Sequence, residues 1–256
     1  MLLQFLRRGL RPRVPADDRR ERLRKVLDRA GVSYSASTPE HALDRVPACL
    51  PPRRPSAAGA PQRLRFPLVI PARVAMFAEG FLPDGAMRRF EPGQSHLLEK
   101  YVPEAIVAPL QLALTLADQK HRRLLAVPGL NTAVVVLTSL GDEPLAGHHK
   151  DLLWMAFGVP VFEQLQSWDG TVIGRECEVH DGLHIDDSSA VLQCSDGELI
   201  VTELTPGAEP VLRGRTGLAA EIVTEHCECG AETPRLKNLA SLHAKGRPKV
   251  RMAVAS

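Results

Sequence analysis

The sequence predicts an α/β fold in which a parallel sheet, built around a βαβ unit, is followed by a small antiparallel β subdomain. The order strand, helix, strand over residues 133–164 predicts the parallel part, and five short strands separated by Gly, Asp and Pro turns after Asp169 predict the antiparallel part. A chain of 256 residues, 44% of them hydrophobic, can bury one core, or one core and a small satellite. Only 4% of the residues are aromatic, so the core must be aliphatic.

The first part of the chain predicts a helix and a linker. Residues Asp18–Ala30 have the period of an amphipathic helix, and Gly31 is suited to end it. Residues Cys49–Gln62 are rich in Pro, Ala and Gly without any period, which is typical of a linker. Residues Phe66–Phe77 favour a strand, and Pro71 restricts it to an edge or a bulge.

The middle of the chain contains the clearest elements. Pro109–Arg123 predicts a helix with apolar residues at i, i+3, i+4 and i+7. Ala133–Thr138 is a continuous apolar run, as expected of a strand buried on both faces. A helix at Leu145–Phe157, ended by Gly158, and a strand at Val159–Gln164 complete the βαβ unit.

Short strands dominate the last third. The predicted strands are Thr171–Glu176, Ala190–Gln193, Glu198–Glu203, Pro210–Arg213 and Ala219–Thr224. The chain is therefore expected to divide into a basic helical arm (1–48), a linker (49–65), an α/β core (66–169), an antiparallel β subdomain (170–236) and a basic tail (237–256).

Charge is distributed unevenly along the chain. Residues 1–65 hold 15 Lys or Arg against 6 Asp or Glu, whereas the whole chain carries only +2. Such an arm could bind nucleic acid or an anionic surface, or it could lie on the acidic body of its own chain. No apolar run reaches the ~18–20 residues of a membrane span, and the start MLLQFLRRGL lacks a cleavage site, so we expect a cytoplasmic protein.

The five cysteines, an odd number without an export signal, argue against a disulfide framework. Cys177, His180, Cys227 and Cys229 supply the four ligands that a closed structural zinc site needs. His184 is the main alternative histidine. The competing interpretation is that the cysteines are small buried hydrophobes and the four residues are unrelated.

Two catalytic interpretations are disfavoured by geometry and pattern. His148 and His149 are adjacent on a helix and point about 100° apart, so they cannot act as a pair. Ser167, His180 and Asp169 have the residue types of a hydrolase triad, but Ser167 lacks the glycine pattern of a nucleophile elbow.

Six segments in chain order carry a resemblance to an enzyme family. Residues 141–145 are similar to the family's SGEPL turn, 157–164 to the lead-in to its YGxSE motif, and 176–185 to its EC…GLHI segment. Residues 197–202 are similar to its GELVVT strand, 213–217 to RYRTG, and 227–230 to CxCG. The sequence thus resembles the phenylacetate-CoA ligase branch of the adenylate-forming (AMP-binding) superfamily. The resemblance implies a partial adenylate-forming core and, as in some relatives, a zinc ion at the cysteines. It also implies a nucleotide-binding role for Arg213, Arg215, Thr216 and Gly217, although a salt bridge suits the arginines as well.

The departures from the family pattern bear on activity. Family members form an acyl-adenylate from ATP, and Asp169 takes the place of their magnesium-linked glutamate. Leu218 replaces the aspartate that binds the ribose hydroxyls, and a leucine cannot accept their hydrogen bonds. No Ser/Thr/Gly-rich phosphate loop precedes Asn131, and 38 residues after Leu218 leave no room for the family's C-terminal lid.

These departures argue against ATP with Mg²⁺, and against CoA, as ligands. The first hypothesis is a degenerate, shortened ligase relative without independent adenylating activity, which acts as a binding, regulatory or scaffold partner of an intact ligase or of its own copies. The alternative is carboxylate activation in which another subunit supplies the phosphate loop and lid, with Asp169 on magnesium. The third is binding of nucleic acid or an anionic surface through the arm.

Overall fold

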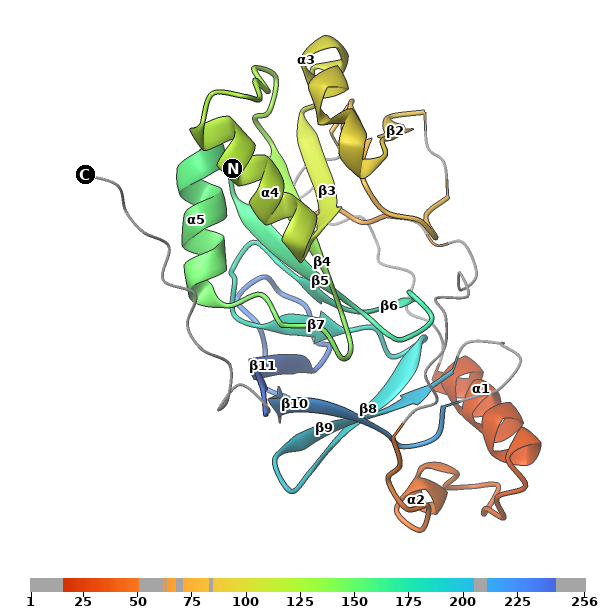
Figure 1. The fold of residues 1–256 in the computed structure, drawn as a ribbon. Helices are drawn as coiled ribbons and strands as arrows, with labels where there is room; N and C mark the ends of the chain where they lie inside the picture. Colours follow the sequence, from red (N-terminus) through yellow and green to blue (C-terminus); the bar gives the residue numbers. More distant parts are fainter. Residues whose placement is uncertain are drawn as a thin grey trace, which may run out of the picture.

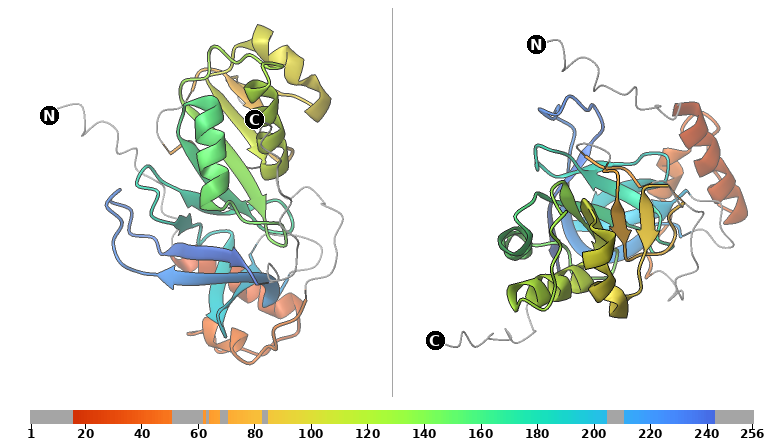
Figure 2. Two further views of the ribbon diagram at one scale, coloured as in Figure 1. Left: turned by 60° about the vertical axis from the view of Figure 1, so that its left-hand side comes forward. Right: turned by 90° about the horizontal axis from the view of Figure 1, so that it is seen from above.

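The computed structural model describes residues 16–50, 62, 64–67, 71–82, 85–204 and 211–242. Within these ranges, the chain forms one sheet of eleven strands in the order β2-β1-β3-β4-β5-β6-β7-β11-β10-β9-β8 (Figures 1 and 2). The α/β fold class is confirmed. The predicted linker 49–65 and the basic tail fall largely outside the described residues.

The parallel half consists of five strands and two helices that cover one face. Its strands are β1 (Val74–Met76), β2 (Met87–Arg89), β3 (Ala105–Pro109), β4 (Ala133–Ser139) and β5 (Val161–Gln166), and every pair of neighbours among these five is parallel. Helices α4 (Leu110–His121) and α5 (Gly147–Phe157) lie side by side over this sheet (Figure 1). The short helices η2 (Pro92–Leu97) and α3 (Leu98–Tyr101) lead into β3.

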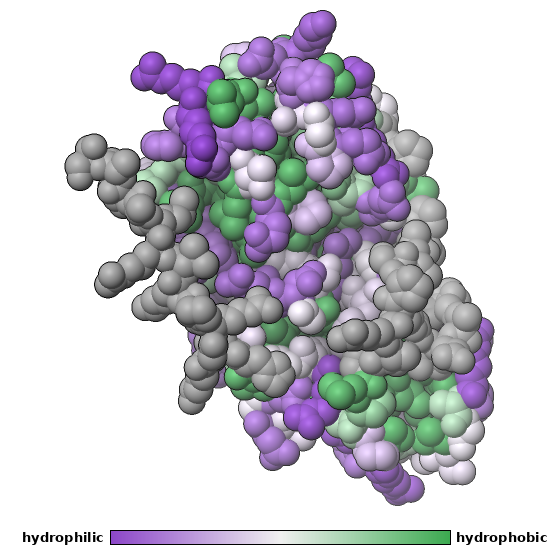
Figure 3. Space-filling view, in the orientation of Figure 1, coloured by the Kyte–Doolittle hydropathy of each residue, from purple (hydrophilic) through white to green (hydrophobic). Residues whose placement is uncertain are grey.

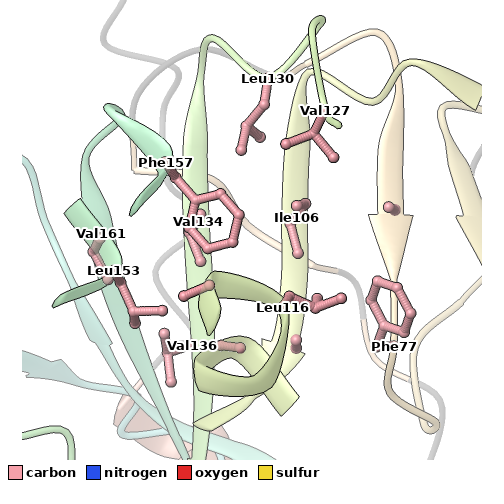
Figure 4. Packing of buried hydrophobic residues seen from close by; sticks show 14 of the residues in the cluster. Phe77, Ile106, Leu116, Val127, Leu130, Val134, Val136, Leu153, Phe157 and Val161 are labelled. Carbon is pink, nitrogen blue, oxygen red and sulfur yellow. The ribbon is translucent and has the colours of Figure 1, made fainter. Parts of the chain in front are cut away.

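Apolar burial on both faces holds the parallel half together. Ile106, Val134 and Val136 pack under α4 and α5, where they meet Leu116 and Leu153 (Figure 4). The alternate residues of the same strands form a second cluster on the opposite face. Its members are Val74, Met76, Val107, Val135 and Leu137, all buried. This two-sided burial is the reason that β4 reads as an unbroken apolar run.

The antiparallel half continues the same sheet without a break. Its strands are β6 (Val172–Glu176), β7 (Leu183–Ile185), β8 (Ala190–Ser195), β9 (Glu198–Glu203), β10 (Gly214–Val223) and β11 (Arg235–Ser241). The turn that contains Asp169 joins β5 and β6 into an antiparallel hairpin, so the hydrogen-bonded sheet continues from one half into the other. β7 and β11 were not predicted, because β7 has only three residues and the seven residues of β11 show no clear apolar alternation. The described residues 211–213, predicted as part of a strand, are irregular instead.

The N-terminal arm packs on the antiparallel half. Helices α1 (Ala16–Arg29) and α2 (Glu40–Leu43) lie beside β8 and β9, at the lower right of Figure 1. Leu23 and Leu27 of α1 are buried against Val191 and Leu204. Arg22 donates a hydrogen bond to the Ser188 carbonyl at 3.0 Å. The described part of the arm therefore lies on the body of its own chain.

Among the described residues, none of the helices has the length and apolar character that a membrane span requires. On the face that Figure 3 shows, hydrophobic and hydrophilic residues lie side by side over α4 and α5.

Candidate metal site and the segment predicted to bind nucleotide

Three cysteines and one histidine meet where β6, β7 and the turn after β10 come together. The ligand atoms of Cys177, His184, Cys227 and Cys229 all lie within 4.8 Å of one another. Two Sγ atoms, those of Cys177 and Cys227, are 3.7 Å apart, and Cys229 Sγ is 3.3 Å from His184 Nε2. A Cys₃His set with four protein ligands is typical of a structural zinc site that leaves no position for water.

Local backbone geometry places each of these ligands. Cys177 and Cys227 each begin a tight turn, closed by the hydrogen bonds from His180 N to Cys177 O (3.1 Å) and from Gly230 N to Cys227 O (2.9 Å). Gly230 has φ +81°, a left-handed conformation that favours glycine. Leu183 and Ile185 of β7 point into the core, so strand alternation turns His184 to the other face, toward the cysteines.

The structure places His184, not His180, with the three cysteines. His180 Nδ1 lies 3.0 Å from Glu176 Oε1, and its ring stacks on Phe162 with centroids 4.7 Å apart. The physical reason is that His180 lies in the turn before β7 with φ 57°, whereas His184 is held by strand pairing. His226, the other histidine nearby, is exposed and outside the group.

The surroundings of the group suit a metal ligand set. His184 Nδ1 lies 3.0 Å from Thr233 Oγ1, which leaves Nε2 directed at the cysteines. Burial raises the pKa of the Cys177 thiol to about 12. Burial opposes ionisation of Cys227 too, but the Cys229 backbone N–H and the positive charge of Arg235 bring its pKa below the ordinary value.

The four residues predicted to bind nucleotide lie at the start of β10, and each has a partner within the chain. Arg215 donates from Nε and Nη2 to Glu198 Oε2 at 2.8 and 2.6 Å. Gly217 N donates to the other oxygen of Glu198 at 2.9 Å, and Thr216 Oγ1 donates to the Leu199 carbonyl at 2.7 Å. Glu198 thus occupies the donors that the resemblance reserves for a phosphate or ribose.

Arg213 follows a different course from Arg215. Arg215 belongs to β10, whereas Arg213 precedes this strand and has φ 45°. Its Nη1 donates to the Leu43 carbonyl of α2 at 2.9 Å. The backbone of Cys49 pairs beside it, accepting a hydrogen bond from Arg215 N at 2.8 Å. The N-terminal arm therefore docks directly on this segment.

Two bulky side chains fill the space around the same segment. Leu218 is buried in the core of the antiparallel half, together with Leu140 and Leu165. The indole of Trp168 packs on Gly214 so closely that an added Cβ would lie 2.7 Å from its Cη2. At the position where the resemblance expects ribose contacts, the chain has a packed core.

Asp169 is engaged in the turn between β5 and β6. Its Oδ1 accepts hydrogen bonds from the hydroxyl of Ser167 and from Thr171 N, the latter at 2.9 Å. This arrangement, in which a short polar side chain caps backbone and hydroxyl donors of its own turn, stabilises the hairpin. Ser167, Asp169 and His180 do not form a triad, because His180 is bonded to Glu176.

A buried carboxylate pair was missed by sequence reasoning. Glu163 Oε1 accepts a hydrogen bond from Thr138 Oγ1 at 2.7 Å, and Glu176 accepts from Glu163 N at 2.9 Å and from Lys150 Nζ at 2.5 Å. Burial raises the pKa of Glu163. A glutamate inside the predicted strand Val159–Gln164 was the available signal. The network ties α5 to β4, β5 and β6.

A small pocket lies at the other end of the parallel half. Its volume is about 260 Å³, and its lining residues are Leu64, Arg65, Phe66, Pro71, Val74, Ala86 and Met87. Among the described residues that line it, Arg65 is the sole charged one, and the others are apolar.

No protein-family model matches this sequence, and no curated protein sequence matches it either. Solved structures of 2-hydroxyisobutyryl-CoA ligase share its fold. The complex with 2-HIB-AMP and CoA in the thioesterification state is 16% identical with a TM-score of 0.60, over 87% of this chain and 68% of the ligase. The open conformation in complex with the same ligands is 16% identical with a TM-score of 0.53, over 66% of this chain and 44% of the ligase.

A third structure of this ligase, in the postadenylation state with R3-HIB-AMP, is 15% identical with a TM-score of 0.58, over 84% of this chain and 62% of the ligase. In two of these three comparisons the chain spans less than two thirds of the ligase's length. At such identities the likeness establishes the fold: a partial core of the adenylate-forming CoA ligase type.

Proposed function

We propose that this chain is a member of the phenylacetate-CoA ligase-like branch that no longer adenylates a carboxylate by itself and acts as a binding or regulatory partner. The support comes from the start of β10. Leu218 is buried in the core and Glu198 takes the side chain of Arg215 and the N–H of Gly217, so binding of a nucleotide there would require these contacts to break. The partner is an intact ligase or a second copy of this chain, and the location is the cytoplasm.

The proposal includes one structural zinc ion held by Cys177, His184, Cys227 and Cys229. When bound, zinc would supply no reaction step, because four protein ligands leave it no open position, and would join the ends of β6 and β10 to β7. Metal analysis of the purified protein should find one zinc per chain, and Cys229→Ser should lower this ratio. The exposed cysteine Cys194 provides a matched control, since Cys194→Ser should leave it unchanged.

Calorimetric titration of Mg-ATP, and separately of AMP, into the zinc-loaded protein tests the central claim. No binding at millimolar nucleotide is expected. Micromolar binding that Arg215→Ala abolishes would overturn the claim.

Micromolar binding would instead support the second candidate, in which this chain activates a carboxylate together with a subunit that supplies the phosphate loop and lid. The observation in its favour is the fold shared with a CoA ligase solved with an acyl-AMP. It requires a stable complex in which Asp169→Ala abolishes activity. Binding of nucleic acid or an anionic surface by the arm is the third candidate, and deletion of residues 1–60 should then abolish a salt-sensitive binding signal.

A further inference from the structure

Arg235, the first residue of β11, has the most buried guanidinium near the cysteine group. Arg235 as a whole is only 2% exposed. Nη1 donates to the carbonyl of Asp181 at 3.0 Å and to the carboxylate of the same residue, and Nη2 donates to the carbonyl of Glu225 at 3.2 Å. A fully buried arginine is rare, because desolvating the cation costs several kcal/mol unless other groups offset it.

The hydrogen bonds of Arg235 join the two segments that carry the metal ligands. Asp181 lies between Cys177 and His184, and Glu225 lies two residues before Cys227. In the sheet, Arg235 is the direct partner of His184 across the β7–β11 pair. Residues opposite each other in an antiparallel pair project from the same face, so the guanidinium and the imidazole lie on the side where the cysteines gather.

The positive charge of Arg235 also affects the electrostatics of the metal site. Three thiolates and a neutral imidazole around a divalent zinc ion leave a net charge of −1 in a largely buried place. Arg235 supplies one positive charge on the same side of the sheet. Its carboxylate partner Asp181 also pairs with the partly exposed Lys237 Nζ at 2.5 Å, but among the hydrogen bonds given for these two cations those of Arg235 reach both ligand segments.

We infer that Arg235 is a positioning and charge-balancing residue of the metal site, which holds both ligand segments at binding distance and offsets the negative charge of the zinc-bound thiolates. The inference rests on the proposed zinc site and adds a residue that is not a ligand. Partners of this kind beyond the ligands change metal affinity by about 10–100-fold in other sites.

The test uses the full chain in three variants: Arg235→Gln, Arg235→Lys and Lys237→Gln. Zinc affinity is measured by competition with a chromogenic chelator, and the ligand field by the visible spectrum of the Co²⁺-substituted protein. We expect Arg235→Gln to weaken zinc binding about 10–100-fold and to shift the cobalt–thiolate absorption. Arg235→Lys should recover part of the affinity, because lysine restores the positive charge but not the guanidinium that donates to both ligand segments. Lys237→Gln, which removes the other cation beside Asp181, should stay within about threefold.

The outcomes separate the two claims. A wild-type protein that binds neither zinc nor cobalt at one ion per chain contradicts the zinc site itself. A wild-type protein that binds zinc while Arg235→Gln binds it equally tightly, with an unchanged cobalt spectrum, overturns the role of Arg235 alone. If Arg235→Gln does not fold, the comparison of Arg235→Lys with Lys237→Gln decides, and equal affinities in both would count against the inference.

Discussion

Strands β3 and β4 of the parallel half are buried on both faces, whereas β10 of the antiparallel half has buried, intermediate and exposed residues along its length. The parallel half is held by two apolar clusters, one under α4 and α5 and one on the opposite face. The antiparallel half has a smaller core and draws on the cysteine group, on buried ion pairs and on the N-terminal arm.

This difference concerns how each half depends on particular residues. Apolar burial is non-directional and spread over many side chains, so the parallel half tolerates the loss of any one contact better. Metal ligands and buried ion pairs need defined geometry and leave costly groups behind when one member is lost. Substitutions in the two halves should therefore differ in kind, and the following predictions test this difference.

Metal removal should have the largest effect. A chelator, or Cys229→Ser, should destabilise the antiparallel half by as much as about 10 kcal/mol, because the binding free energy of a structural zinc ion contributes to folding. Hydrogen exchange should accelerate in β7, β10 and β11 while β4 stays protected. Equal acceleration in β4 would contradict the comparison.

A matched pair of core substitutions should have the next largest effect. Leu153 of the parallel half and Leu199 of the antiparallel half are both fully buried. Replacing either by Ala should lower the free energy of unfolding by about 2–5 kcal/mol. In urea titrations with and without chelator, the effect of Leu199→Ala should change when metal is removed and that of Leu153→Ala should not. Equal responses would show that the halves are one cooperative unit.

Glu163→Gln should have a smaller, pH-dependent effect. Burial raises the folded-state pKa of Glu163 above its ordinary 4.5, so the folded protein holds the proton more tightly than the unfolded chain. Its charge therefore lowers stability as the pH rises above about 4.5 toward the raised pKa. Because Gln keeps the acceptor for Thr138, the variant should gain stability relative to wild type between pH 5 and pH 8 in denaturant titrations. A difference that is constant over this range would count against the raised pKa.

Asp169→Ala should have the smallest effect. Loss of its hydrogen bonds in the β5–β6 turn should cost about 1–2 kcal/mol. The exposed Asp151 is a control, and Asp151→Ala should change the free energy of unfolding by about 0.5 kcal/mol or less. A drop for Asp169→Ala no larger than that of the control would mean that the turn does not need the carboxylate.

The parallel half could be predicted from the sequence, and the antiparallel half only in part. The continuous apolar run around Val135 and the segment around Leu153 that Gly158 ends are local signals, so β4 and α5 were predicted to within two residues. β11 was missed because its residues RLKNLAS show no clear apolar alternation, and its pairing with β7 joins residues about 50 positions apart, such as His184 and Arg235. Spacing alone could name the cysteines but could not choose between His180 and His184, since the choice depends on where β7 begins.

The docking of α1 has a consequence for the order in which the protein is made. Its apolar face, which includes Leu27, is covered by Leu204, and these two residues are 177 positions apart in the sequence. At about 5–20 residues per second, a ribosome needs roughly 9–35 s to add the intervening chain. During that interval α1 emerges with an uncovered hydrophobic stripe, and nascent chains should be bound there by chaperones until β9 is synthesised.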